Sequence, residues 1–133
     1  MSSNIETRVV VTGMGAITCL GNSVEQFWTG VKNGQSGIRK ISLVSPDGFP
    51  CSVSGEIQDF DPTEHMDRKE ARRMARFSQF AIVAADQAVE DAGLDFEQEN
   101  LDRVGVLIGS GSGGLPETDQ QSEIRVKRGV GRM

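Results

Sequence analysis

The sequence has 133 residues, which suffices for one small domain. Hydrophobic residues make up 37% of it, and with 16 glycines the composition is that of a globular protein whose backbone bends often. The net charge of -5 excludes general nucleic-acid binding, because a phosphate backbone attracts a basic surface. The opening segment, MSSNIETRVVVTG, is neither a signal peptide nor a membrane span.

Cysteine and histidine are too few and too scattered for a metal centre. Cys19 and Cys51 lack CxxC spacing, and His65 is the single histidine, so neither a zinc site nor a disulfide framework is predicted. Neither cysteine has His, Lys or Arg as a close sequence neighbour, and His65 is expected to be a surface residue of a short turn, so no nucleophile–base pair is predicted. We therefore expect a soluble, cytoplasmic protein with reduced thiols, no metal, no cofactor, and neither a membrane nor a nucleic acid as partner.

Local patterns predict strands alternating with helices. The expected strands are β-branched or alternating apolar runs, and the expected helices follow capping residues and carry apolar stripes. In chain order, the sequence predicts a buried strand at 8–12, a helix from the Asn22 cap to Asn33-Gly34, a turn at Pro46–Gly48, a strand at 52–57, a helical turn at Asp61–Glu64, a long helix from Asp67 to Gly93, a strand at 103–108 and a helix from about Leu115 to Lys127. This β-α-β-α-β-α order favours an α/β sheet layered with helices, and three strands make that sheet small and incomplete.

The long predicted helix has two distinct faces. One is rich in alanine between Phe77 and Ala92, which implies close packing against another backbone. The other is basic, because four cations recur at helical spacing: Lys69, Arg72, Arg73 and Arg76. Such a face attracts an acidic protein or a phosphate group. The alternative is an ordinary solvated face, partly compensated by Glu70.

The glycine-rich loop Gly109–Gly114 follows a predicted strand and precedes a predicted helix. Its G-x-G-x-x-G pattern can place backbone N–H groups against a pyrophosphate. A dinucleotide site also needs an acidic residue at the end of a following strand, about twenty residues on, and the chain offers none there. A tight strand-to-helix turn is the favoured interpretation, and a nucleotide-binding domain stays open as an alternative.

Six segments together resemble the elongating β-ketoacyl-acyl-carrier-protein synthases, especially synthase II. They are VVVTGMGAITCLGN (Val9 to Asn22), SGI (Ser36 to Ile38), GEIQDFDP (Gly55 to Pro62), RKEARRMARFSQFA (Arg68 to Ala81), VEDAGL (Val89 to Leu94) and RVGVLIGSGSGGL (Arg103 to Leu115). The resemblance covers nearly the whole chain and less than half of a family protein. Polyketide ketosynthases share parts of the pattern, and the RKEARRM segment favours the stand-alone enzyme.

The resemblance implies the N-terminal part of a thiolase-like fold in a homodimeric enzyme. The implied reaction transfers an acyl chain from acyl carrier protein to a cysteine, after which malonyl-carrier protein loses carbon dioxide and its carbanion attacks the thioester. The family's catalytic cysteine, histidines and lysine lie beyond the matched region, so residues 1–133 are expected to form a partial domain, truncated before the catalytic cysteine, with no catalytic residue and no activity alone. A non-catalytic module that binds acyl carrier protein is the alternative from another class.

The resemblance also implies roles for five residues. Four match cations with which such synthases dock acyl carrier protein: Lys69, Arg72, Arg73 and Arg132. Ser112 matches the position in the glycine loop that gates the acyl pocket. Relatives often have an apolar side chain there, so the preferred acyl chain length stays open. Cys19 stands where relatives commonly have proline and is not expected to be the nucleophile.

Overall fold

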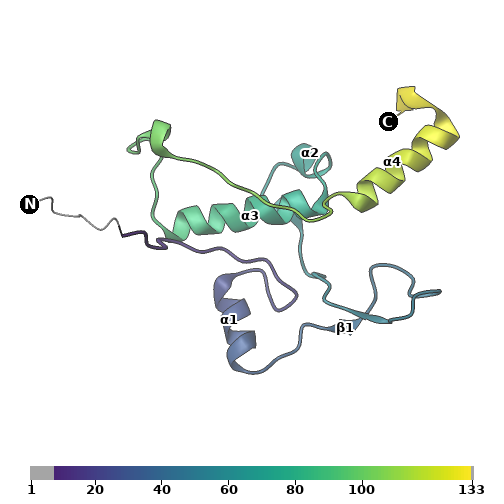
Figure 1. The fold of residues 1–133 in the computed structure, drawn as a ribbon, viewed down its shortest axis with the longest axis horizontal. Helices are drawn as coiled ribbons and strands as arrows, with labels where there is room; N and C mark the ends of the chain where they lie inside the picture. The colour runs from purple at the N-terminus through teal and green to yellow at the C-terminus, as the bar shows by residue number, and fades with distance from the viewer. Residues whose placement is uncertain (1–7, 133) are drawn as a thin grey trace, which may run out of the picture.

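The computed structural model describes residues 8–132, and side chains as far as residue 131. Four α-helices, a two-stranded sheet and three 3-10 turns follow one another along the chain (Figure 1). They are α1 (Val24–Lys32), β1 (Arg39–Lys40), β2 (Val53–Ser54), η1 (Pro62–Glu64), α2 (Arg68–Ala71), α3 (Arg76–Asp91), η2 (Leu101–Arg103), α4 (Leu115–Arg128) and η3 (Val130–Arg132). None of the helices in this described part is long and apolar enough to cross a membrane.

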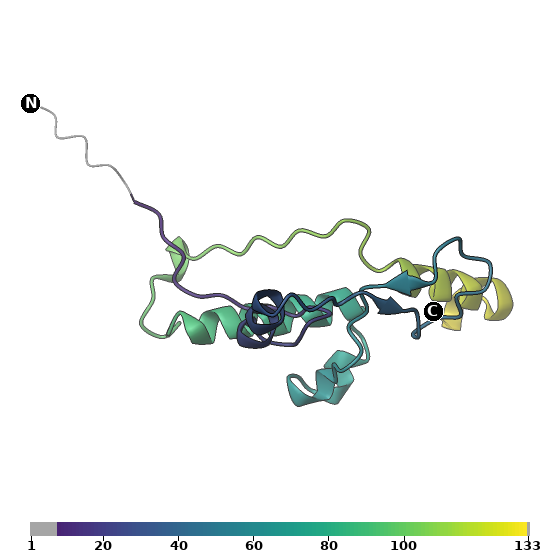
Figure 2. The same cartoon turned by 90° about the horizontal axis from the view of Figure 1, so that it is seen from below.

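Helix α3 is the central element. It is the longest helix, at 16 residues, and its Val83 is the most deeply buried side chain, 2% exposed. The extended segment 104–112 runs alongside it in both views, while α4 continues beyond its N-terminal end (Figures 1 and 2). On the opposite side lie α1 and the small sheet (Figure 1).

The extended segment 13–16 packs directly on the backbone of α3. A Cβ atom on Gly15 would lie 1.8 Å from the Ala84 carbonyl oxygen, and one on Gly13 would lie 2.2 Å from the Ala88 oxygen. Only glycine permits so close an approach. The alanine face of the predicted long helix does meet another backbone, which confirms that expectation.

Side chains of α3 also satisfy the backbone of this segment. The amide of Met14 donates to the Asp91 carboxylate at 2.9 Å, and the amide of Ala16 donates to Oε1 of Gln87 at 3.0 Å. Nε2 of the same glutamine donates to the Asn22 carbonyl at 2.7 Å. One helix therefore supplies both the packing surface and the hydrogen-bond partners of an extended chain.

The predicted strands 8–12 and 103–108 are wrong in detail. Neither segment forms a strand, and Arg103 belongs instead to the 3-10 turn η2. Both segments are exposed, with Val9 92% and Leu107 99% exposed. The predicted strand 52–57 shrinks to β2, which pairs antiparallel with β1, a strand that the sequence patterns did not predict. A β-strand needs a neighbouring strand with which to form backbone hydrogen bonds. Among residues 8–132, segments 8–12 and 103–108 have no such neighbour.

The predicted helix boundaries are mostly confirmed. Helix α1 is capped by Ser23, one residue after the expected Asn22, and Gly34 follows its end at φ 64°. The 3-10 turn η1 begins with proline under an Asp61 cap, as expected. Helix α4 ends at Arg128, one residue beyond the prediction. The Pro46–Gly48 turn is closed by a 3.1 Å bond from the Phe49 amide to the Pro46 carbonyl.

Candidate functional site: a basic elbow before helix α3

The long helix expected from Asp67 to Gly93 is broken into α2 and α3. Asp67 caps α2 as predicted, its carboxylate accepting from the amides of Lys69 at 2.7 Å and Glu70 at 3.4 Å. The helix then stops after one turn, and Ala75 is extended, with φ -64° and ψ 149°. We call the intervening residues Arg72–Ala75 the elbow. The continuous basic face inferred from helical spacing is therefore wrong.

Gln79 holds the elbow from the inside. Its side-chain Nε2 donates to the carbonyl of Ala71 at 2.8 Å and to that of Met74 at 3.4 Å. Gln79 is only 8% exposed, and no other polar residue in the described part of the chain is buried. Ala71, to which it bonds, is buried as well. The periodicity of the sequence assigned this glutamine no role, because only the break in the helix reveals what it binds.

Arg76 turns away from the other cations. Its Nη2 donates to the Ile57 carbonyl at 2.6 Å, and its guanidinium lies over the rings of Phe60 and Phe80, at 5.7 Å and 4.9 Å from their centroids. Its backbone amide donates to Oε1 of Glu117 on α4 at 3.3 Å. Arg76 therefore joins three segments of the fold, which agrees with its omission from the expected docking residues.

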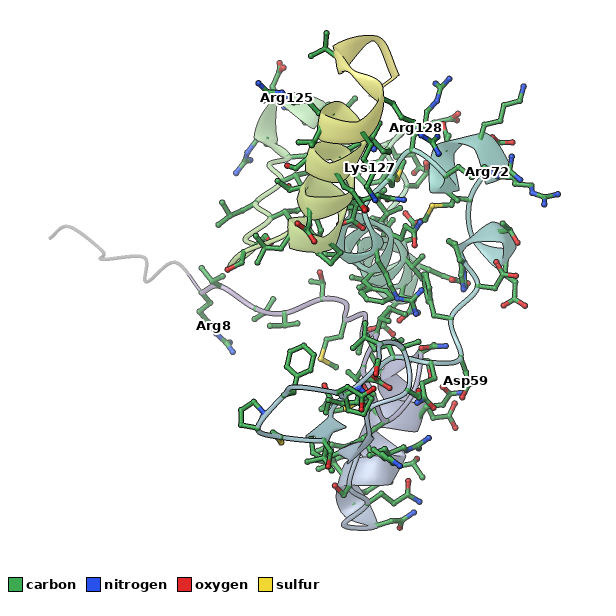
Figure 3. The ribbon with its side chains drawn as sticks, turned by 90° about the vertical axis from the view of Figure 1, so that its right-hand side faces the viewer. Arg8, Asp59, Arg72, Arg125, Lys127 and Arg128 are labelled. Carbon is green, nitrogen blue, oxygen red and sulfur yellow. The ribbon has the colours of Figure 1, made fainter. Side chains whose placement is uncertain are left out.

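The elbow and α2 present the remaining three cations to solvent. Lys69, Arg72 and Arg73 are all exposed, and Figure 3 shows the Arg72 side chain projecting outward from the molecule. In the described part of the chain, an ion pair forms only between Lys127 and Glu123 on α4. The compensation by Glu70 that belonged to the alternative of a solvated face is not seen among the described side chains. Three closely spaced positive charges remain available to an anionic partner.

Arg132 is placed only in part. Its backbone belongs to η3, directly after α4. Its side chain lies outside the described residues, so its predicted part in the basic site stays a prediction. Three other cations of the last turns of α4 are seen in Figure 3: Arg125, Lys127 and Arg128.

The glycine-rich loop folds against the first turn of α3. A Cβ on Gly113 would lie 2.9 Å from the Phe77 ring, and Gly114 caps α4 at φ 78°, a left-handed conformation that favours glycine. Ser110 Oγ accepts from the Gly113 amide at 3.1 Å, while Ser112 is exposed. Packing and turn geometry explain Gly113 and Gly114, which supports the interpretation as a tight turn into a helix, although no strand precedes it in the described chain.

No nucleophile–base pair forms among residues 8–132. Cys19 packs against Gly37, where a Cβ would come within 2.3 Å of its sulfur, and the Cys51 thiol donates to the Val53 carbonyl at 3.5 Å. His65 stacks on Phe60, with centroids 5.8 Å apart. The described residues also contain no cluster of three potential metal ligands.

Glu56 is a feature that sequence patterns missed. Its carboxylate accepts from the amides of Ser42 at 3.0 Å and Leu43 at 3.1 Å, and from the Ser42 hydroxyl at 2.9 Å. Removal from water raises the pKa of Glu56, but these hydrogen bonds, with one from Gln58, outweigh that effect and lower the pKa below its ordinary value. The carboxylate thus anchors the turn after β1.

Solved structures with a similar fold are thiolase-like ketosynthases. "The ishigamide ketosynthase/chain length factor" superposes with a TM-score of 0.69 at 30% identity, covering 90% of this chain and 30% of that one. A β-ketoacyl synthase from Burkholderia phymatum STM815 gives 0.71 at 30% identity, over 92% and 30%. "AntDE:AntF (apo): type II PKS acyl-carrier protein in complex with its ketosynthase bound to the hexaketide" gives 0.72 at 25% identity, over 96% and 33%. The fold is therefore an incomplete thiolase-like α/β fold.

Residues 6–133 match the family model "Beta-ketoacyl synthase, N-terminal domain", and the chain belongs to that family. The 3-oxoacyl-[acyl-carrier-protein] synthase 2 of Synechocystis sp. is 45% identical over 131 residues, 98% of this chain and 32% of the relative. That of Staphylococcus aureus (strain MRSA252) is 49% identical over 115 residues, 86% and 27%. The chain thus spans about a third or less of the curated relatives it matches.

Proposed function

We propose that this chain is the N-terminal part of a 3-oxoacyl-[acyl-carrier-protein] synthase that elongates fatty acids by decarboxylative condensation. The observation that carries the proposal is the match of residues 6–133 to the β-ketoacyl synthase N-terminal domain, together with 45–49% identity to synthase 2 enzymes. The full enzyme works in the cytoplasm as a homodimer.

The chemistry belongs to residues outside this chain. Condensation needs a thiolate nucleophile and groups that stabilise a developing enolate. Cys19 and Cys51 do not supply the thiolate, because each packs without a histidine, lysine or arginine hydrogen-bonded to its sulfur within the described part of the chain. Residues 1–133 alone, as a partial domain, bind but do not condense.

The contribution of this chain is recognition. Lys69, Arg72, Arg73 and Arg132 dock the acyl carrier protein, an acidic partner, by charge complementarity. The exposure of the first three on α2 and the elbow supports this role, as does the presence of a carrier protein in the AntDE:AntF complex. Ser112, exposed in the loop before α4, gates the acyl pocket.

A charge-reversal experiment tests the docking role. In the full-length protein that carries this chain, Lys69→Glu, Arg72→Glu and Arg73→Glu together should weaken binding of a purified bacterial holo-acyl carrier protein about tenfold or more, because each lost pair becomes a repulsion. Added salt should weaken binding of the unaltered protein and so reduce the difference in affinity between it and the triple variant. Isothermal titration at two salt concentrations gives both quantities.

A matched control separates docking from net charge. Lys32→Glu, Arg39→Glu and Lys40→Glu change the charge equally on exposed residues of α1 and β1. This control should bind as the unaltered protein does. Equal affinity of the Lys69, Arg72 and Arg73 variant and the unaltered protein would remove the docking proposal. Condensation by the 133-residue chain alone, with acyl- and malonyl-carrier protein, would remove the assignment of catalysis to other residues.

A further inference from the structure

We propose that Gln79 is a positioning residue for carrier-protein docking, holding the elbow so that Arg72 and Arg73 face the partner. This inference rests on the proposed docking function of those arginines. It follows from two observations: the break between α2 and α3, and the buried amide that bridges it.

Helix α2 is too short to keep its place unaided. It has four residues, and a helix of one turn is unstable in isolation, because nucleation costs more than so few hydrogen bonds return. Asp67 fixes its first turn through two capping bonds. Its other end needs a partner outside the helix.

The break leaves the Ala71 carbonyl without its α-helical partner. In a continuous helix the Ala71 oxygen would accept from the amide of Ala75, four residues on. Here Ala75 is extended, and the Ala71 oxygen instead lies 2.8 Å from Nε2 of Gln79 and 3.4 Å from the Met74 amide. The same Nε2 also bonds the Met74 oxygen at 3.4 Å. The side chain of Gln79 therefore takes the place of the missing backbone donor.

Removing that donor favours a different arrangement. The buried Ala71 carbonyl would be left with one weak bond, which is costly, and a straightened helix would satisfy it through Ala75. Straightening rotates Arg72 and Arg73 relative to α3. It also strains the bond from the Arg76 guanidinium to Ile57, which fixes the start of α3. Gln79 thus acts on docking through the arginines, without touching the partner.

Gln79→Leu in the full-length protein tests the inference. The substitution keeps the volume and removes the donor. We expect the affinity for bacterial holo-acyl carrier protein to fall about tenfold. KM for carrier-bound substrates should rise in proportion, while kcat with acyl- and malonyl-coenzyme A, an assay in which no carrier protein takes part, stays unchanged. Amide hydrogen exchange of Arg72–Ala75 should accelerate, which a simple loss of charge at the surface would not cause.

Gln87→Leu is the matched control. Gln87 also lies on α3, and its Nε2 also donates to a backbone carbonyl, that of Asn22, but it has no contact with the elbow. It should alter stability without changing carrier-protein affinity. Gln79→Met is a second variant of similar length without a donor, and it should match Gln79→Leu if the lost donor, and not the branched shape of leucine, causes the effect.

The outcomes separate the inference from the function on which it rests. If Arg72→Glu with Arg73→Glu weakens binding and folded Gln79→Leu or Gln79→Met binds normally, the positioning role is overturned and docking stands. If the double reversal itself leaves binding unchanged, both are overturned. An equal loss of affinity in Gln87→Leu would also overturn the positioning role, because the effect would then be general to α3.

Discussion

Among single residues, Glu56 makes the densest set of local hydrogen bonds. It accepts from two backbone amides and a hydroxyl after β1. Because these bonds lower its pKa below the ordinary value of a glutamate, the stability they provide is present above that ordinary value and is lost as the pH falls through the lower pKa of the folded chain.

Glu56→Gln should therefore destabilise the protein near neutral pH, and its difference from the unaltered protein should vanish in acid. Thermal unfolding of both proteins across an acid series measures this. Glu99→Gln removes the same charge from a side chain without a hydrogen bond in the described structure and should change little at any pH. A pH-independent effect of Glu56→Gln would contradict the assignment.

Gly15 sits where no other residue fits. Gly15→Ala would place a methyl group 1.8 Å from the Ala84 carbonyl oxygen, so segment 13–16 must move off α3. We expect a loss of about 1–3 kcal/mol in the free energy of unfolding, the usual cost of overpacking. Chemical denaturation of the full-length protein measures it. Gly105→Ala is the control, since a Cβ there meets nothing within 4 Å; equal effects would argue against the close approach.

At the level of elements, the start of α3 lacks a capping side chain of its own. Ala75 occupies the N-cap and makes no side-chain hydrogen bond, and Glu117 from α4 binds the Arg76 amide instead. Serine at the N-cap can accept from the second or third amide of the helix. Ala75→Ser should raise the free energy of unfolding by about 1 kcal/mol, detected as a higher Tm. A lower Tm would mean that serine disturbs the elbow more than it caps the helix.

The helices were largely predictable and the strands were not, for a physical reason. Caps and apolar stripes are local, so α1 and α4 are recognisable within a few residues of their ends. A strand depends on a neighbour that need not be near in sequence, and segments 8–12 and 103–108 lack one among the residues described. Their β-branched composition indicated extended chain correctly, but could not supply the pairing.

The cations of the basic site could be identified from the sequence, but their arrangement around the break between α2 and α3 could not. Spacing placed Lys69, Arg72, Arg73 and Arg76 on one face because it assumed an unbroken helix. The break depends on Gln79, whose side chain satisfies a carbonyl eight residues earlier, and on Arg76 binding the distant Ile57. No short-range pattern reports such contacts. The docking role itself came from family resemblance.

For the molecule as a whole, the described chain leaves much apolar surface uncovered. Segment 104–108 is exposed throughout, and a groove of about 1190 Å³ opens over the alanines of α3, between segments 13–16 and 107–109 and helix α1. Patches of this kind normally mark surfaces that other protein covers. The match to only about a third of each relative agrees with that expectation.

The 133-residue chain alone should therefore form large, concentration-dependent oligomers and bind a hydrophobic dye, whereas the full-length protein should remain the proposed homodimer and bind little dye. Size-exclusion chromatography with light scattering, over a range of concentrations, measures the first property, and dye fluorescence measures the second. Val106→Lys should reduce self-association, because Val106 is exposed in the uncovered segment. If the 133-residue chain stays monomeric at high concentration and does not enhance the dye's fluorescence, the prediction of an uncovered apolar surface is contradicted.

The first turn of α3 links two places that otherwise look separate. Arg76 bonds α4 through Glu117, Phe77 lies under Gly113 of the loop that contains Ser112, and Gln79 holds the elbow. These residues belong to one rigid turn, so a displacement of that turn moves the elbow and the loop together. If the elbow receives the carrier protein and the loop admits the acyl chain, then docking and acyl entry are mechanically coupled through the residues Arg76–Gln79.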